Sequence, residues 1–134
     1  MTPYYVKLYL ATLGAFLAID LVWLGLVARR FYAKQLGFLL SPSTNWPAAV
    51  AFYLLFVAGL LVFVVVPGVR HGSLGRVALM GALFGLVSYA TYDLTNLATI
   101  QGWPLILTLV DLMWGTILAA SVSSIGFLAA KWMS

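Results

Sequence analysis

The sequence contains no cysteine, a single histidine and only three acidic residues among its 134. The lack of cysteine excludes disulfides, thiolate metal sites and thiol redox chemistry. The single histidine, His71, excludes the sites with several histidines that hold iron or zinc in membrane oxygenases and hydrolases. Charged residues make up 7% of the chain, against about 25% in an ordinary soluble domain. The chain is therefore not a soluble globular protein.

Long apolar runs take the place of the missing charge, and hydrophobic residues make up 64% of the sequence. Several runs of about 20 residues are each long enough to cross the roughly 30 Å hydrocarbon core of a bilayer. We therefore expect an all-α polytopic membrane protein, a four-transmembrane-helix bundle that forms one integral membrane domain over residues 1–134. The lipid bilayer is then its first partner.

The predicted membrane helices cover about residues 5–27, 47–66, 76–100 and 105–130. Between the first two, residues 29–40 have basic and apolar positions at helical spacing, which predicts a short interfacial helix. Residues 67–75 are predicted to form a basic loop, and Gln101 to Pro104 a tight turn that makes the last two helices antiparallel neighbours.

The seven basic residues all lie near predicted helix ends. This placement is typical of anchoring at the membrane interface and does not indicate nucleic-acid binding. The two termini and the second connection carry four of the seven, so we expect both the N- and C-termini in the cytoplasm.

All three acidic residues lie inside the apolar runs: Asp20, Asp93 and Asp111. Each stands seven to nine residues from the nearest helix end, a depth of roughly 10–14 Å at 1.5 Å per residue. In an antiparallel bundle those three ends belong to the same side of the membrane, so the carboxylates share one layer. An ionised aspartate facing lipid costs about 2.5–3.5 kcal/mol. We therefore expect all three to face inward.

Helical spacing of three and four residues gives each aspartate polar or aromatic neighbours on its own face. Because the third and fourth helices are predicted neighbours, the faces of Asp93 and Asp111 should oppose each other. We predict an intramembrane pocket for a ligand or protons, with aromatic walls. Its predicted members are Asp20, Trp23, Tyr89, Tyr92, Asp93, Asn96, Thr108, Asp111 and Trp114.

Two arginines follow the first membrane helix on the same side of the membrane as the aspartates. Arg29 and Arg30 are most simply interfacial stop signals, and a guanidinium reaching inward as a counter-ion is the alternative. Trp103 is predicted to belong to the interfacial aromatic belt, and the second helix, which contains Tyr53 as its single polar residue, to be plain scaffold.

Three sequence blocks carry a resemblance to a known family: Tyr92-Asp-Leu-Thr-Asn96, Gly102-Trp-Pro104 and Asp111-Leu-Met-Trp-Gly115. With Asp20 and Trp23 in the first helix, they resemble small bacterial membrane proteins catalogued as domain of unknown function 2177, over nearly the whole chain. The resemblance implies a four-helix, multi-pass protein of the bacterial cytoplasmic membrane. It implies no activity.

Three classes of function are compatible with such a pocket. The first is binding or transport of a small amphiphilic or cationic molecule, with transport favouring a homodimer because four helices leave little room for a path. The second is an intramembrane enzyme, in which the aspartates act as acid and base or hold Mg²⁺, Mn²⁺ or Ca²⁺. The third is a structural or accessory subunit whose polar stripe docks a helix of a partner protein. We expect binding or transport and no cofactor, and we keep the enzyme and the structural subunit as alternatives.

Overall fold

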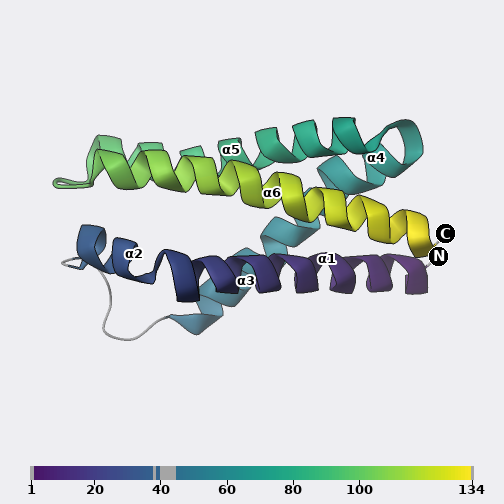
Figure 1. The fold of residues 1–134 in the computed structure, drawn as a ribbon, viewed down its shortest axis with the longest axis horizontal. Helices are drawn as coiled ribbons and strands as arrows, with labels where there is room; N and C mark the ends of the chain where they lie inside the picture. Colours follow the sequence, from purple (N-terminus) through teal and green to yellow (C-terminus); the bar gives the residue numbers. More distant parts are fainter. Residues whose placement is uncertain (1, 38, 40–44, 134) are drawn as a thin grey trace.

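The computed structural model describes residues 2–37, 39 and 45–133, and the regular secondary structure in this part of the chain is helical (Figure 1). Four helical stretches of 25, 26, 26 and 29 residues are long and apolar enough to span a membrane. The prediction of an all-α bundle with four membrane helices is confirmed.

Each of the first two membrane stretches is built from more than one helical segment. Stretch one, Pro3–Val27, is α1 (Thr2–Val22) without its first residue, continued by a π-helical turn η1 (Trp23–Val27). The chain then bends into α2 (Arg29–Leu36). Stretch two is α3 (Trp46–Leu60), a second π-helical turn η2 (Leu61–Val65) and α4 (Val66–His71). The remaining two are the unbroken helices α5 (Leu74–Thr99) and α6 (Leu105–Met133).

The short helix expected after the first membrane helix is present as α2, although it ends at Leu36. Of the rest of the predicted range, Phe38 and Leu40 lie outside the described residues.

The basic loop predicted for residues 67–75 is wrong, because the second membrane stretch remains helical to His71. Proline lacks an N–H and its ring crowds the carbonyl four residues earlier, which favours a break. Here the widened turn η2 directly precedes Val66 and Pro67, so the helix continues past the proline. The helix stops only at Gly72, and Ser73 then caps α5 by accepting a hydrogen bond from the Arg76 backbone N–H at 3.3 Å.

Helices α5 and α6 form a closely packed hairpin. Gly102 adopts a positive φ of 81° in the turn between them, a conformation that favours glycine. A Cβ at Gly81 would lie 2.6 Å from Ser123 Oγ, and one at Gly85 would collide with the Gly115 carbonyl. The predicted close approach through Gly81 and Gly85 is therefore confirmed, and the two helices are antiparallel neighbours.

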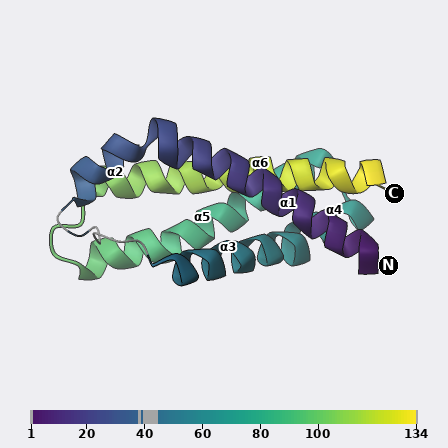
Figure 2. The ribbon, with the colours of Figure 1, turned by 90° about the horizontal axis from the view of Figure 1, so that it is seen from below.

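The second membrane stretch runs obliquely across the bundle. Its first part, α3, packs against α1, whereas η2 and α4 pack against α5 and α6. Figure 1 shows this slope and α1 running beside α6, while Figure 2 shows α1 crossing α6 obliquely, with both chain ends at the same end of the molecule.

The apolar core lies in the middle of the bundle and in the half that carries the termini. Its main cluster includes Phe16, Val57, Leu118 and Val122, and a second cluster surrounds Leu8. The oblique course of α3 opens the bundle at the other end, beside α2 and the turn from α5 to α6.

Candidate functional site: an aspartate and aromatic cavity

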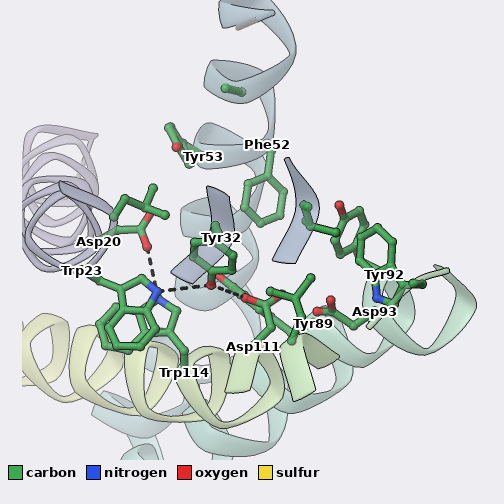
Figure 3. Close-up of a pocket in the computed structure, with 15 residues that line it drawn as sticks. Asp20, Trp23, Tyr32, Phe52, Tyr53, Tyr89, Tyr92, Asp93, Asp111 and Trp114 are labelled. Carbon is green, nitrogen blue, oxygen red and sulfur yellow. Dashed lines mark hydrogen bonds between the residues drawn. The ribbon is translucent and has the colours of Figure 1, made fainter. Parts of the chain in front are cut away.

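The three aspartates line one cavity of about 460 Å³ at the end of the bundle opposite the termini (Figure 3). Its walls come from α1, η1, α2, α3, α5, α6 and the turn before α6. The described residues that line it include eight aromatic side chains and no basic one. They are Asp20, Trp23, Leu24, Tyr32, Leu36, Ala49, Phe52, Tyr53, Tyr89, Tyr92, Asp93, Trp103, Leu107, Asp111 and Trp114.

Two stacked tryptophans form one wall of this cavity. The rings of Trp23 and Trp114 lie 4.3 Å apart and are inclined by only 9°. Trp114 Nε1 donates a hydrogen bond to Asp20 Oδ1 at 3.2 Å (Figure 3), so this indole both forms the wall and fixes the carboxylate. Both tryptophans were predicted from their spacing of three residues after an aspartate.

Tyr32 ties the short helix α2 to the cavity. Its hydroxyl accepts a hydrogen bond from Trp23 Nε1 at 3.2 Å and donates one to Asp111 Oδ1 at 2.7 Å. Burial raises the pKa of Tyr32, so the hydroxyl keeps its proton and remains a donor at physiological pH. Tyr32 was not among the predicted site residues, because an amphipathic segment beyond the membrane run predicts an interfacial position and not a site.

Asp93 is the carboxylate without a donor. Its side chain is 0% exposed, and neither carboxylate oxygen accepts a hydrogen bond within the described structure. Figure 3 shows the carboxyl of Asp111 beside it on the wall of the same cavity, and no hydrogen bond joins the two in the described structure. Two ionised carboxylates are both acceptors only, so this pair can form a hydrogen bond only by sharing a proton.

Figure 3 shows the two predicted tyrosines of α5, Tyr89 and Tyr92, on the same side of the cavity as Asp93. The ring of Tyr89 packs over Gly115, where a Cβ would leave it no room. The ring of Tyr92 meets Trp103 edge to face, with 5.8 Å between ring centroids.

The prediction that Trp103 lies in the interfacial belt is wrong. Its side chain is only 8% exposed and lines the cavity. Trp103 Nε1 donates a hydrogen bond to Thr108 Oγ1 at 3.1 Å, and that hydroxyl donates in turn to the Pro104 carbonyl at 3.1 Å. Thr108 was predicted to line the cavity, but it does not. It positions the indole of Trp103 instead.

Three further predicted residues do not line the cavity. Asn96 is half-buried one turn beyond Tyr92, and the side chains of Arg29 and Arg30 are exposed at the start of α2. The structure thus brings the aspartates together with aromatic rings and does not bring the arginines to them.

The second membrane stretch also contributes to the site, so its interpretation as plain scaffold is wrong. Ala49, Phe52 and Tyr53 of α3 line the cavity. Tyr53, the single polar residue of that helix, was the signal in the sequence that pointed to this role.

The aspartates do not gather into a three-carboxylate cluster. Over the described residues, no three aspartate or histidine side chains come close enough together to hold one metal ion. Asp93 and Asp111 are neighbours in the cavity wall, while Asp20 has its own donor, the Trp114 indole.

The scan against protein-family models finds a match between residues 5–128 and the family described as "Predicted membrane protein (DUF2177)". The chain belongs to this family. Family membership agrees with the four membrane helices, and the function of the family is unknown. Neither a curated protein nor a solved structure matches the chain.

Proposed function

We propose that this membrane protein binds a protonated amine, presented by an otherwise apolar molecule, in the aspartate and aromatic cavity. The observation that carries the proposal is Asp93, a fully buried carboxyl that no donor of the described residues reaches. A buried polar group without a partner lowers stability by about 1–3 kcal/mol. A ligand that supplies a positive charge and an N–H donor would satisfy it once the Asp93 side chain turns into the cavity that it lines.

The walls of the cavity favour the same ligand chemistry. Aromatic faces attract cations through the negative charge density above the ring, most strongly tryptophan and tyrosine. Trp23, Trp114, Tyr89 and Tyr92 all line the cavity, while the described lining contains no arginine or lysine that would repel a cation. Its volume of about 460 Å³ lies within the usual range for small-molecule pockets.

The packing of the opposite half of the bundle supports binding over passage through a single copy of the chain. Between the cavity and the termini, the helices meet around buried side chains such as Phe16, Leu60 and Leu118. A molecule that moved onward would have to displace this core. Release of the ligand toward the side from which it entered requires no such displacement of the core.

Binding of n-butylamine, compared with its uncharged analogue n-butanol, tests the proposal. At pH 7 the amine is protonated, so calorimetry on the detergent-solubilised protein should detect the amine and not the alcohol. Asp93→Asn should weaken amine binding by about tenfold or more, because the charge-assisted hydrogen bond to a carboxylate is lost. Ser124→Ala serves as a control, since Ser124 only donates to the Ala120 carbonyl of its own helix.

Two results would contradict the proposal. One is equal affinity for the amine and the alcohol, which would mean that charge plays no part. The other is unchanged amine affinity in Asp93→Asn, which would place the amine elsewhere on the protein.

A further inference from the structure

A second cavity of about 360 Å³ adjoins the first. Its lining is Phe52 of α3, then Ser88, Tyr89 and Tyr92 of α5, and Asp111 of α6. All of these except Ser88 also line the aspartate and aromatic cavity. The two spaces therefore share a boundary, and we call the second one the α3–α5 groove.

The groove lies on the lipid-facing side of the bundle. Because α3 packs against α1 before crossing toward α5, a space remains between the first part of α3 and the second half of α5. Phe52 and Tyr92 border this space and are 44% and 56% exposed. Both helices belong to membrane-spanning stretches, so these exposed surfaces face the bilayer.

The chemistry changes along the groove. Its inner boundary is Asp111, which accepts the Tyr32 hydroxyl and faces Asp93. Away from Asp111 its lining is aromatic except for Ser88, whose hydroxyl already donates to the Phe84 carbonyl at 2.8 Å. The groove thus offers aromatic surface, with the hydroxyls of Ser88, Tyr89 and Tyr92 as its other polar groups, beside a cavity that offers carboxylates.

We infer that the α3–α5 groove holds the hydrocarbon tail of the ligand, and that the ligand is a single-chain amphiphilic amine that reaches the aspartates sideways from the bilayer. This inference rests on the proposed function, because the groove can hold the tail of the ligand only if the amine of that ligand binds beside Asp93. A polar end at the carboxylates and an apolar end in lipid is the arrangement that such a molecule already has in a membrane.

Photo-crosslinking locates the tail directly. The probe is dodecylamine with a diazirine at the middle of its chain, added to the full-length protein in lipid nanodiscs, and the adducts are mapped by mass spectrometry. We expect adducts at Phe52, Ser88 and Tyr92 to exceed those at Leu83, a lipid-facing residue of α5, by about tenfold, since a held tail samples few positions. Excess n-butylamine should reduce the groove adducts, because it competes for the same carboxylates.

Two matched variants on α5 sharpen the test. Ser88→Trp fills the groove, so adducts at Phe52 and Tyr92 should fall to the level of Leu83. Val87→Trp places the same ring at the neighbouring position, which is 56% exposed and borders neither cavity, so it should leave the adducts unchanged.

The outcomes separate the two proposals. Adducts spread evenly over lipid-facing residues, together with butylamine binding that Asp93→Asn abolishes, would overturn the tail site and leave the amine site standing. Groove adducts that neither butylamine nor Asp93→Asn reduces would identify an ordinary lipid site and overturn the inference. Failure of butylamine to bind at all would overturn both.

Discussion

The half of the bundle that carries the chain ends and the half that carries the aspartates are built from the same helices but are held together differently. Toward the ends, α5 and α6 meet through glycine and other small residues, and closely packed aliphatic and phenylalanine side chains fill the space around them. Around the cavity, the contacts are stacked or tilted aromatic rings and hydrogen bonds between side chains far apart in the chain.

We infer from this difference that the packed half provides most of the stability of the bundle and that the cavity half binds the ligand. A small-residue interface leaves no space for a ligand. The aromatic rings at the other end leave a cavity, and its wall contains carboxyl groups that can bind a ligand. In the packed half, added volume should be harmful. In the cavity half, replacing an unpartnered carboxyl group should be tolerated or even favourable, and should weaken ligand binding instead.

The largest effect on stability should come from Gly85→Leu in the packed half. A side chain there would collide with the Gly115 carbonyl and with Ala119 Cβ, so α5 and α6 must separate. Overpacking of this kind lowers the free energy of unfolding by about 3 kcal/mol. Unfolding in mixed micelles with increasing sodium dodecyl sulfate, followed by circular dichroism, measures the loss.

Gly14→Leu is the matched control for this substitution. Nothing outside its own helix lies within 4 Å of a Cβ at Gly14, so the larger side chain should extend into lipid. Stability should stay the same or rise by up to about 1 kcal/mol, because leucine favours the helix more than glycine does. Equal losses in the two variants would mean that close approach of α5 and α6 does not hold the bundle together.

The next effect should come from Asp93→Asn, and it should have the opposite sign. An amide can donate to the neighbouring Asp111 carboxylate without a shared proton, so the pair is satisfied internally. We expect the free energy of unfolding to rise by about 1–3 kcal/mol while amine binding is lost. Stability gained at the expense of binding is the usual result when a functional site is relieved of an unsatisfied group.

Asp20→Asn should behave differently from Asp93→Asn. Asp20 already has the Trp114 indole as donor, and an amide oxygen can still accept that bond, so stability should change little. If Asp93→Asn destabilised the protein more than Asp20→Asn, the carboxyl of Asp93 would have a partner and the proposed amine site would lose its basis.

The sequence predicted the packed half well because its signals are local. Helix lengths follow from apolar runs, and Gly81 and Gly85 stand four residues apart on one helix, where spacing alone predicts a contact face. The local signal that misled was Pro67 followed by Gly68. That pair normally indicates a loop, and the π-helical turn η2 that absorbs the proline has no comparable sequence signature.

The cavity half was predicted only in part. Depth in the membrane was enough to place three aspartates in one layer, and spacing was enough to add Trp23 and Trp114. Tyr32 joins the site across 79 residues of sequence to Asp111, and Trp103 is turned inward by Thr108. Such contacts depend on where the helices cross, which periodicity does not determine.

The smallest effect should come from Tyr32→Phe, which tests whether α2 is fastened to the bundle through the cavity. The substitution keeps the ring and removes the hydroxyl that links Trp23 to Asp111. Loss of one hydrogen bond of this kind is worth about 1 kcal/mol, or roughly fivefold in an opening equilibrium. Hydrogen exchange of the amides of Arg29–Leu36 should therefore become about fivefold faster, with little change in the membrane helices.

Tyr5→Phe makes the same chemical change in the packed half, near the start of α1, and should leave exchange in α2 as it is. Faster exchange in α2 alone would show that the short helix is held by its bond to the cavity, so that a ligand displacing Tyr32 from Asp111 would also loosen α2. Unchanged exchange in Tyr32→Phe would mean that packing of Leu36 against the cavity wall is sufficient to hold α2 in place. The hydrogen bond to Asp111 would then not couple α2 to the aspartates.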